Sequence, residues 1–419
     1  FIVCGAGVAA SRLVNRAGCA DLADGGTTMI RLGIVGCGGR GAGMARAFAA
    51  GCPEVRIAGV VDPDGKGARK RLGEYGRGTI FYKTLKEMAR KARLDCLMIA
   101  TRCHQHTPYA IEAAAYVMPL FLEKPVAISM EQAIALERAY EKARNQVVVS
   151  FPLRVSPLCR ITRSYIEENA VGRPEHILAV NYVPYGTCYF DDGYRDYSIT
   201  QGLFLQKATH DFDYMMYLMG QSIVRVAAMK ICGHVFGGRK PAGLRCSACD
   251  EARTCRESPE NRKLNDAGGA TFDHPCVFGE EIGSPRTGMN EDASNAIVEF
   301  ADGSQGVYTQ VFFTRRDAGT RGATISGYKG TLRFDWYTNE LRRVRHFAPF
   351  SDTIRAGGNA SHFGGDTALL KNFADVVMGH ANSLTPISIG IQSVYACLAA
   401  KESTETGRFV KVRQVGAVK

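Results

Sequence analysis

Three glycines carry the first chemical signal in the chain. Gly36 ends a short apolar segment, residues 30–36, and Gly38 and Gly41 follow it before a helical pattern over residues 44–50. Glycines in this order allow a tight turn and a close backbone approach, and they leave N–H groups free at the positive end of a helix. Such a loop suits the diphosphate of a dinucleotide. The proposed cofactor-binding set in this loop is Gly36, Gly38, Gly39, Arg40 and Gly41.

An aspartate at the end of the next apolar segment bears on which dinucleotide binds. Residues 56–61 form that segment, and Asp62 follows it. A carboxylate at this place accepts hydrogen bonds from both ribose hydroxyls of NAD and repels the 2′-phosphate of NADP. Four basic residues that could pair with such a phosphate come shortly afterwards: Lys66, Arg69, Lys70 and Arg71. NAD is therefore the preferred cofactor, and NADP remains the alternative.

A histidine within an apolar helical pattern is the candidate proton-transfer group. The spacing of apolar residues predicts one helix from Leu205 to Met219. Lys207, His210 and Tyr214 would then share one face of it, and Lys207 would contact the substrate. A neutral imidazole can accept a hydroxyl proton while hydride leaves the same carbon. A core histidine with only structural hydrogen bonds is the alternative.

The elements that must position these residues alternate regularly in the first part of the chain. Strand and helix patterns follow one another from residue 29 to residue 151, which predicts an α/β domain with a doubly wound parallel sheet. Ligands of such sheets bind beyond the carboxyl ends of the strands. Two polar loops fall there: Thr101 to His106, and Glu123-Lys124-Pro125.

The regular alternation of strand and helix patterns stops after residue 151. This change predicts a second domain over residues 152–413. It carries a long cysteine-containing insertion at about residues 232–292. The pattern over residues 293–313 predicts a hairpin of two strands. Residues 1–28 lack the cationic start of a signal peptide, so we expect an N-terminal extension there.

Taken together, these motifs resemble the Gfo/Idh/MocA family, named for glucose-fructose oxidoreductase, inositol dehydrogenase and rhizopine catabolism proteins. The resemblance spans about residues 30–413 and includes the glycine loop, Glu123-Lys-Pro and Thr209-His-Asp-Phe-Asp213. It implies a Rossmann domain followed by an α+β domain with an open, mostly antiparallel sheet. It also implies hydride transfer between a nicotinamide and a carbon of a sugar or cyclitol, in a homodimer or homotetramer.

The resemblance assigns roles to individual residues. Lys124 matches the active-site lysine of the family, and its ammonium would polarise the reacting C–O bond. His210 matches the general acid/base histidine. The remaining residues that the resemblance places at the cofactor are Thr101, His106, Glu123 and Pro125.

Two positions depart from the family pattern. Arg102 stands where a proline is common, and Gln206 stands where many members have an aspartate. A neutral amide cannot stabilise an imidazolium as a carboxylate does, so we expect either a lower basicity of His210 or a different role for the adjacent Lys207.

Candidate substrate contacts come from an aromatic stretch and from a late histidine. Tyr182 and Tyr185 belong to a run of aromatic residues before the predicted catalytic helix, and aromatic rings are good platforms for sugars. His362 precedes Asp366, which we expect to cap the following helix. Loop packing is the alternative for all of these side chains.

The insertion contains a candidate metal site. Cys246, Cys249 and Cys255 have a spacing compatible with a structural zinc, completed by another cysteine or histidine of the insertion. A disulfide and unligated thiols are the alternatives.

Composition excludes several functional classes. The chain has 419 residues, with 52 Lys and Arg against 41 Asp and Glu, but the basic residues are spread out and predict no nucleic-acid partner. No apolar run reaches the roughly 18–20 residues that a bilayer crossing needs. Many of the 14 cysteines lie in apolar segments, as Cys96 does, and buried thiols predict a cytoplasmic location.

The leading hypothesis is therefore an NAD-dependent oxidoreductase acting on CH–OH groups of carbohydrates or cyclitols. An NAD-dependent glycosidase, which oxidises a sugar transiently and eliminates its substituent, is a second hypothesis. The third is a non-enzymatic, cofactor-loaded regulatory protein, which the joint presence of Lys124 and His210 disfavours.

Overall fold

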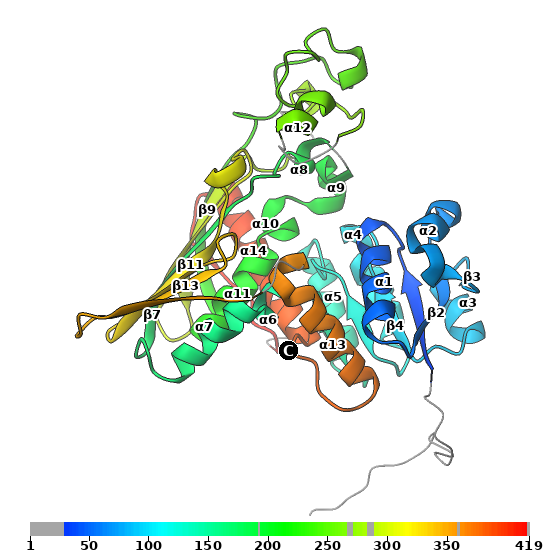
Figure 1. The fold of residues 1–419 in the computed structure, drawn as a ribbon, viewed down its shortest axis with the longest axis horizontal. Coiled ribbons are helices and arrows are strands. Elements are labelled where there is room, and N and C mark those ends of the chain that lie inside the picture. The colour runs from blue at the N-terminus through cyan, green and yellow to red at the C-terminus, as the bar shows by residue number, and fades with distance from the viewer. Residues whose placement is uncertain (1–28, 192, 266–270, 283–288, 358–360, 417–419) are drawn as a thin grey trace, which may run out of the picture.

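The computed structural model describes residues 29–191, 193–265, 271–282, 289–357 and 361–416. The extension predicted over residues 1–28 lies outside the described residues. Two sheets with their helices lie side by side, and the long insertion projects from one end of the second sheet (Figure 1).

The first sheet is parallel throughout, as the alternating pattern predicted. Its strand order is β3-β2-β1-β4-β5-β6, and the order reverses direction between β1 and β4. This reversal is the point at which doubly wound sheets bind ligands. The strands are β1 (Ile30–Val35), β2 (Val55–Val61), β3 (Ile80–Phe81), β4 (Cys96–Ile99), β5 (Leu120–Leu122) and β6 (Val147–Val149).

Helices connect the strands of this sheet and cover both of its faces. Its central strands are apolar and buried over nearly their whole length, which is typical of a parallel sheet with two covered faces. The connecting helices are α1 (Gly39–Gly51), α2 (Gly65–Leu72), α3 (Leu85–Lys91), α4 (Cys103–Ala113) and α5 (Met130–Tyr140).

The second sheet has nine strands and is mostly antiparallel. Its order is β14-β13-β12-β11-β7-β10-β9-β8-β15, and only β7 and β10 run parallel. The predicted fold class is thus confirmed for both sheets. The strands are β7 (Pro174–Tyr182), β8 (Ile223–Ile231), β9 (Ala293–Phe300), β10 (Gln305–Val311), β11 (Thr320–Gly327), β12 (Gly330–Asp335), β13 (Glu340–Arg345), β14 (Ser351–Arg355) and β15 (Val410–Lys411).

Helices lie on one face of the second sheet and separate it from the first (Figure 1). The segment between β8 and β9 carries α12 and forms the projecting part. The helices are α6 (Pro152–Val155), α7 (Pro157–Glu167), α8 (Cys188–Asp191), α9 (Tyr197–Thr200), α10 (Leu203–Gln206), α11 (Thr209–Met219), α12 (Pro259–Asn265), α13 (Gly365–Val377) and α14 (Ile387–Thr406).

A late helix completes the core of the first sheet. Helix α13 packs against α1, and the ring of Phe373 contacts Phe48 and Phe121 at centroid distances of 5.3 and 5.6 Å. All three rings are at most 1% exposed. The first half of the molecule is therefore built from segments that are far apart in the chain.

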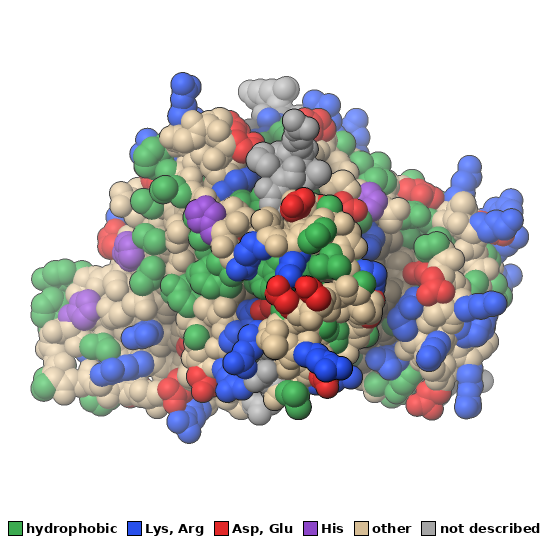
Figure 2. Space-filling view, turned by 90° about the horizontal axis from the view of Figure 1, so that it is seen from above, with side chains coloured by type: hydrophobic (Ala, Val, Ile, Leu, Met, Phe, Trp, Pro, Cys, Tyr) green, Lys and Arg blue, Asp and Glu red, His purple; other side chains and the backbone are tan. Residues whose placement is uncertain are grey.

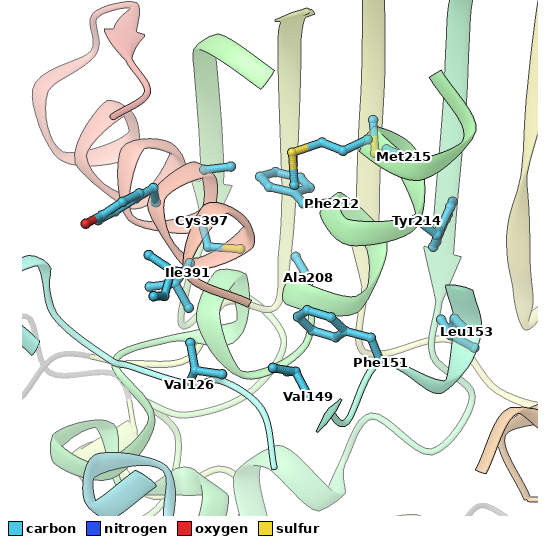
Figure 3. Close-up of a cluster of buried hydrophobic side chains, with 14 of the residues drawn as sticks. Val126, Val149, Phe151, Leu153, Ala208, Phe212, Tyr214, Met215, Ile391 and Cys397 are labelled. Atoms are coloured by element: carbon cyan, nitrogen blue, oxygen red, sulfur yellow. The ribbon is translucent and has the colours of Figure 1, made fainter. Parts of the chain in front are cut away.

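A second cluster of apolar side chains joins the two halves and fixes the position of α11. Ala208 and Phe212 face Ile391 and Cys397 of α14, and Phe151, at the end of the first half, closes the cluster from below (Figure 3). Deleting a large buried side chain from such a core costs about 3–5 kcal/mol for phenylalanine. His210 lies on the same helix as Phe212, so this packing holds it in place.

None of the described helices, including the 20-residue α14, combines the length and apolar character that a bilayer crossing requires. On the face shown in Figure 2, basic and acidic side chains are interspersed over both halves of the molecule.

Candidate functional site

A cavity of about 1060 Å³ lies at the carboxyl ends of β1, β2 and β4. Gly36 has φ +82°, and a Cβ there would lie 2.6 Å from the backbone N of Thr101. A Cβ on Gly41 would lie 2.3 Å from the Gly36 carbonyl oxygen. Gly38 and Gly39 line the cavity, and a Cβ on either would meet no atom within 4 Å. Side chains at these two positions would occupy the cradle that a diphosphate needs, so the loop fits a dinucleotide.

The start of α1 is open to the cavity. Its N-cap, Gly38, offers no side-chain hydrogen bond, so the first N–H groups of the helix remain free for an anion. The neighbouring Arg40 turns away from them. Its Nε lies 2.7 Å from Glu123 Oε1, and its two terminal nitrogens each lie 2.8 Å from an oxygen of Asp366. Arg40 therefore connects the glycine loop to the end of β5 and to α13. Its side chain also forms part of the cavity wall.

Asp62 lies at the end of β2, in the wall of the same cavity. Its carboxylate accepts N–H groups of Cys37 and Asp64 at 2.6 and 2.8 Å. A carboxylate has about four lone-pair directions, so it can still accept ribose hydroxyls. Arg71 lies beside it and donates to the Cys37 carbonyl at 2.8 Å and to Asp64 at 3.2 Å.

A smaller cavity of about 330 Å³ adjoins the first, and residues from both halves of the molecule line it. Arg40, Thr101, Arg102 and Tyr194 line both cavities, so the two are neighbours there. Lys124 enters from the first half of the chain. The second half contributes four more predicted site residues, which are Tyr185, Lys207, His210 and His362.

The predicted continuous helix from Leu205 to Met219 is wrong. Helix α10 ends at Gln206, and α11 begins at Thr209. The last carbonyls of a helix have no intrahelical partner, and Lys124 Nζ donates to the Gln206 carbonyl oxygen at 2.5 Å. The break thus supplies the acceptor that holds the lysine in the cavity.

Because of this break, the three residues expected on one helical face do not stay together. Lys207 and His210 line the cavity, whereas Tyr214 points into the core. Its hydroxyl donates to the Gly322 carbonyl at 3.2 Å, and its ring packs on Trp336 at 5.0 Å. Tyr214 is therefore a structural residue.

Lys124 has an environment that destabilises its charge. Removal from water is the largest cause, and the nearby Lys207 ammonium adds to it, which together lower the pKa of Lys124 to about 8. The Lys124–Pro125 peptide bond is cis. A lysine with such a pKa donates a hydrogen bond strongly and remains mostly charged at neutral pH.

His210 is 4% exposed, and its ring is neutral at pH 7. Burial is the largest cause that holds its pKa well below 6.5, and the charges of Lys124 and Arg321 act in the same direction. The ring packs edge-on against Phe151 at 6.0 Å and lies 6.0 Å from the ring of His362. Its Nδ1 has no partner among the described residues. The same is true of Gln206 Oε1, whose residue also lines the cavity, and both atoms are buried.

The two aspartates after His210 are structural. Asp211 accepts from Arg321 at 2.8 Å and from Asn181 at 2.9 Å. Asp213 forms a two-pronged pair with Arg154, the shortest distance being 2.6 Å. Removing one partner of such a buried ion pair lowers the free energy of unfolding by about 3–5 kcal/mol. These pairs anchor α11 from both sides and so fix the direction of His210.

Loop contacts position the remaining residues of the first half. His106 lies 2.8 Å from the Pro125 carbonyl and 3.0 Å from the Thr101 carbonyl, and so joins the two predicted loops. Glu123 is 6% exposed and accepts from Ser150 at 3.0 Å as well as from Arg40. Both residues act through their neighbours: His106 orients the Lys124 loop, and Glu123 orients Arg40.

Some predicted residues lie elsewhere. Tyr182 ends β7, where it pairs with Val311 and Thr320, and it lines neither cavity. The N-cap of α13 is Gly364, not Asp366, because the Asp366 carboxylate is already engaged by Arg40, Ser361 and His362.

The zinc prediction finds no support in the geometry of the insertion. Cys246 Sγ lies 3.6 Å from His274 Nε2, but that nitrogen also lies 3.1 Å from the Glu257 carbonyl. Over the described parts of the insertion, no three Cys, His, Asp or Glu side chains converge as metal ligands. Cys246, Cys249 and Cys255 are free thiols.

Sequence reasoning missed several cavity residues. Tyr194 lines both cavities, although only its place in an aromatic run marked it. Arg102 was noted as a departure from the family pattern, and its guanidinium reaches Gly193: a Cβ on Gly193 would lie 2.1 Å from it. Asp366 and Ser150 join the Arg40 cluster, and no local pattern indicates that they meet.

Comparison with known proteins places this arrangement in a family. The profile described as "Oxidoreductase family, NAD-binding Rossmann fold" matches residues 30–151, and that of the C-terminal alpha/beta domain matches residues 192–412. Levoglucosan dehydrogenase in complex with NADH and L-sorbose is similar in structure, with a TM-score of 0.70 at 19% identity, over 93% of this chain and 100% of that one. At this identity the similarity shows the fold alone.

Curated relatives agree with the profiles. YteT of Bacillus subtilis is 25% identical over 355 residues, which cover 75% of this chain and 81% of YteT. The rhizopine catabolism protein MocA of Rhizobium meliloti is 29% identical over 227 residues, which cover 53% of this chain and 69% of MocA. Since the two profiles together match most of the sequence, the chain belongs to the Gfo/Idh/MocA family of oxidoreductases.

Proposed function

We propose that the protein is an NAD-dependent oxidoreductase acting on a CH–OH group of a sugar, a sugar derivative or a cyclitol. The observation that carries this proposal is the convergence of Lys124 and His210, from different halves of the chain, in a small cavity that adjoins the dinucleotide cavity. The names of similar proteins, a rhizopine catabolism protein and a levoglucosan dehydrogenase, support the substrate class.

The residues divide the chemistry between them. When bound, NAD supplies the acceptor for the hydride. The neutral His210 ring takes the hydroxyl proton as the hydride leaves the same carbon, and the Lys124 ammonium stabilises the negative charge that grows on the oxygen. In the reverse direction, His210 returns the proton to the carbonyl oxygen. The glycine loop, Asp62 and Thr101 would hold the cofactor.

One observation favours a redox-assisted glycosidase as the second candidate. Elimination from a transient ketone needs another base, which removes a proton from the adjacent carbon. Tyr185 lines the cavity with its hydroxyl 2.8 Å from Lys207 Nζ. Burial raises the pKa of Tyr185, but the Lys207 and Arg321 charges outweigh it and lower that pKa. The lowered pKa favours the phenolate form of Tyr185, and that phenolate can serve as the second base.

A product analysis tests both candidates. The purified chain is incubated with NAD and a panel of sugars, inositols and glycosides, and mass spectrometry detects keto products and released aglycones. Keto products with equimolar NADH support the dehydrogenase, whereas free aglycone without net NADH supports the glycosidase. Binding of NADH without any turnover would contradict both and favour a cofactor-loaded regulatory protein.

Asp62 is proposed to select NAD over NADP, and its replacement tests this. We expect Asp62→Asn to lower the ratio of the NADPH Kd to the NADH Kd by about tenfold, because the repulsion of the 2′-phosphate is removed while Arg71 stays nearby. Fluorescence titration with both reduced cofactors measures the ratio. Glu87→Gln, which removes the same charge from an exposed ion pair on α3, is the control and should leave the ratio unchanged. An Asp62→Asn ratio equal to that of the wild type would contradict the assignment.

We also propose a homo-oligomer, formed through the outer face of the second sheet. Leu178, Val307 and Ile297 lie in register on three neighbouring strands, and Met229 follows on the next strand. Ile297 is 52% exposed and Met229 is 77% exposed, which is unusual for side chains in the middle of a sheet. We expect light scattering to give a dimer or tetramer, and Ile297→Lys to shift it toward the monomer. A monomeric wild type would contradict this proposal.

A cytoplasmic location is proposed on the burial of thiols. Cys96 and Cys397 are fully buried in apolar cores, and such thiols persist where the environment is reducing.

A further inference from the structure

The smaller cavity carries an excess of positive charge. The described residues that line it include four cationic side chains and one carboxylate. Arg40 is already paired with this carboxylate, Glu123, and with Asp366, so the excess charge comes from the other three cations. The cations are Arg40, Arg102, Lys124 and Lys207.

Lys207 is the most unusual of these cations. It is 5% exposed, and its ammonium donates to the Tyr185 hydroxyl at 2.8 Å. It also lies over the rings of Tyr185 and Tyr189, at 5.0 and 5.8 Å from their centroids. Neither partner carries a negative charge in its ordinary state. Among the described residues, no carboxylate lies within ion-pair distance of Lys207 Nζ.

Other buried cations in the described part of the chain have the carboxylate partner that Lys207 lacks. Two further cationic side chains are buried as deeply, Arg262 and Arg321, and each is paired with a buried aspartate, Asp191 and Asp211 respectively. A buried charge is costly unless a counter-ion compensates it. Lys207 differs from these two arginines in having no carboxylate partner among the described residues, and it lies at a place where a ligand can enter.

The diphosphate of the cofactor is not the missing anion. The glycine loop that suits it lines the larger cavity, and Lys207 lines the smaller cavity only. The positive charge of the oxidised nicotinamide would add to the field in which a substrate binds. An anionic substrate would gain from this field, and a neutral sugar would not.

We infer that the substrate is an acidic sugar, whose carboxylate binds Lys207. This inference rests on the proposed function and names its substrate class. Lys207 donates one hydrogen to the Tyr185 oxygen and has two left for the carboxylate, while the Tyr185 hydroxyl hydrogen is available to the same group. Lys124 and His210 remain free to act on the hydroxyl that is oxidised. A sugar phosphate presents a similar anion and is distinguished by experiment.

Matched pairs of sugars test the inference. D-glucose with D-glucuronate and D-galactose with D-galacturonate are compared for binding to the NADH-loaded protein by saturation-transfer NMR, and for kcat/KM with NAD. D-glucose 6-phosphate forms a third arm. We expect the wild type to prefer at least one uronate over its neutral partner by about 10- to 100-fold, the difference that a charge-assisted hydrogen bond makes. A preference for the phosphate over the uronate would overturn the choice of carboxylate.

Variants distinguish a specific contribution of Lys207 to acid binding from a general effect of the protein's net charge. Lys207→Met should lower the ratio of acid affinity to neutral-sugar affinity to about one, whereas Lys207→Arg should keep part of the preference. Lys91→Met, on the exposed surface of α3, is the control for net charge. NADH affinity confirms that each variant is folded.

The outcomes distinguish this inference from the proposed function. Equal binding of acid and neutral sugar by the wild type overturns the inference, even when turnover supports an oxidoreductase. Preferential binding of the acid without NADH formation overturns the oxidoreductase and keeps the anion site. Equal losses on both sugars in Lys207→Met would show that Lys207 does not recognise the carboxylate.

Discussion

We expect replacement of His210 by glutamine to reduce kcat for sugar oxidation by about 10²- to 10⁴-fold, the range that general acid/base groups contribute. Glutamine retains polarity but cannot accept the hydroxyl proton. Because His210 lines only the smaller cavity, the NADH Kd should stay within about threefold of the wild type. Stopped-flow detection of NADH formation, together with an NADH titration, measures both quantities.

The pH profile adds an independent check on His210. Its pKa is held well below 6.5, chiefly by burial, so the ring is the neutral, proton-accepting form throughout the neutral range. Activity should therefore fall only when the pH drops well below 6.5. His346→Gln serves as the control, since His346 is exposed near the outer strands and contacts Thr331. A His210→Gln enzyme with wild-type kcat would refute the assignment.

Replacement of Lys124 by methionine should lower kcat by about 10²- to 10³-fold, which is the usual effect of removing one donor from a developing oxyanion. Methionine fills a similar volume and removes the charge. The Gln206 carbonyl would lose its partner as well, so thermal unfolding should be measured alongside kcat. Lys91→Met again controls for net charge and should leave kcat unchanged.

The same lysine predicts an alkaline limit for the wild type. Its pKa is lowered to about 8, so the ammonium is present below that pH and is lost as the pH rises through it. The kcat/KM for sugar oxidation should decline above pH 8 in the wild type, and this decline should be absent in Lys124→Met. A wild-type rate that rises through pH 8 would show instead that neutral Lys124 acts as a base.

Much of the fold was predictable because its signals are local. Apolar strands alternating with helical patterns indicated the parallel sheet, and the segment 293–313 indicated the β9–β10 hairpin that the structure contains. The glycine loop was also predictable from the sequence, because the steric reason for Gly41 lies within the loop itself. The second sheet was expected from family resemblance and not from periodicity.

The candidate site was only partly predictable. Lys124, His210, Lys207, Tyr185 and His362 meet in one cavity as expected. The helix break at Lys207 was missed because apolar spacing continues across it. The Arg40 cluster was missed for a different reason: Glu123 and Asp366 lie far from Arg40 in sequence, and no pattern within one element indicates that they meet.

The return of α13 to the first sheet has a consequence for how this protein is made. The sequence places a domain boundary between residues 151 and 152, but the rings of Phe48 and Phe121 pack against Phe373. On the ribosome, this apolar core therefore remains incomplete until residue 373 has been synthesised. A nascent chain in that state is a natural client for chaperones.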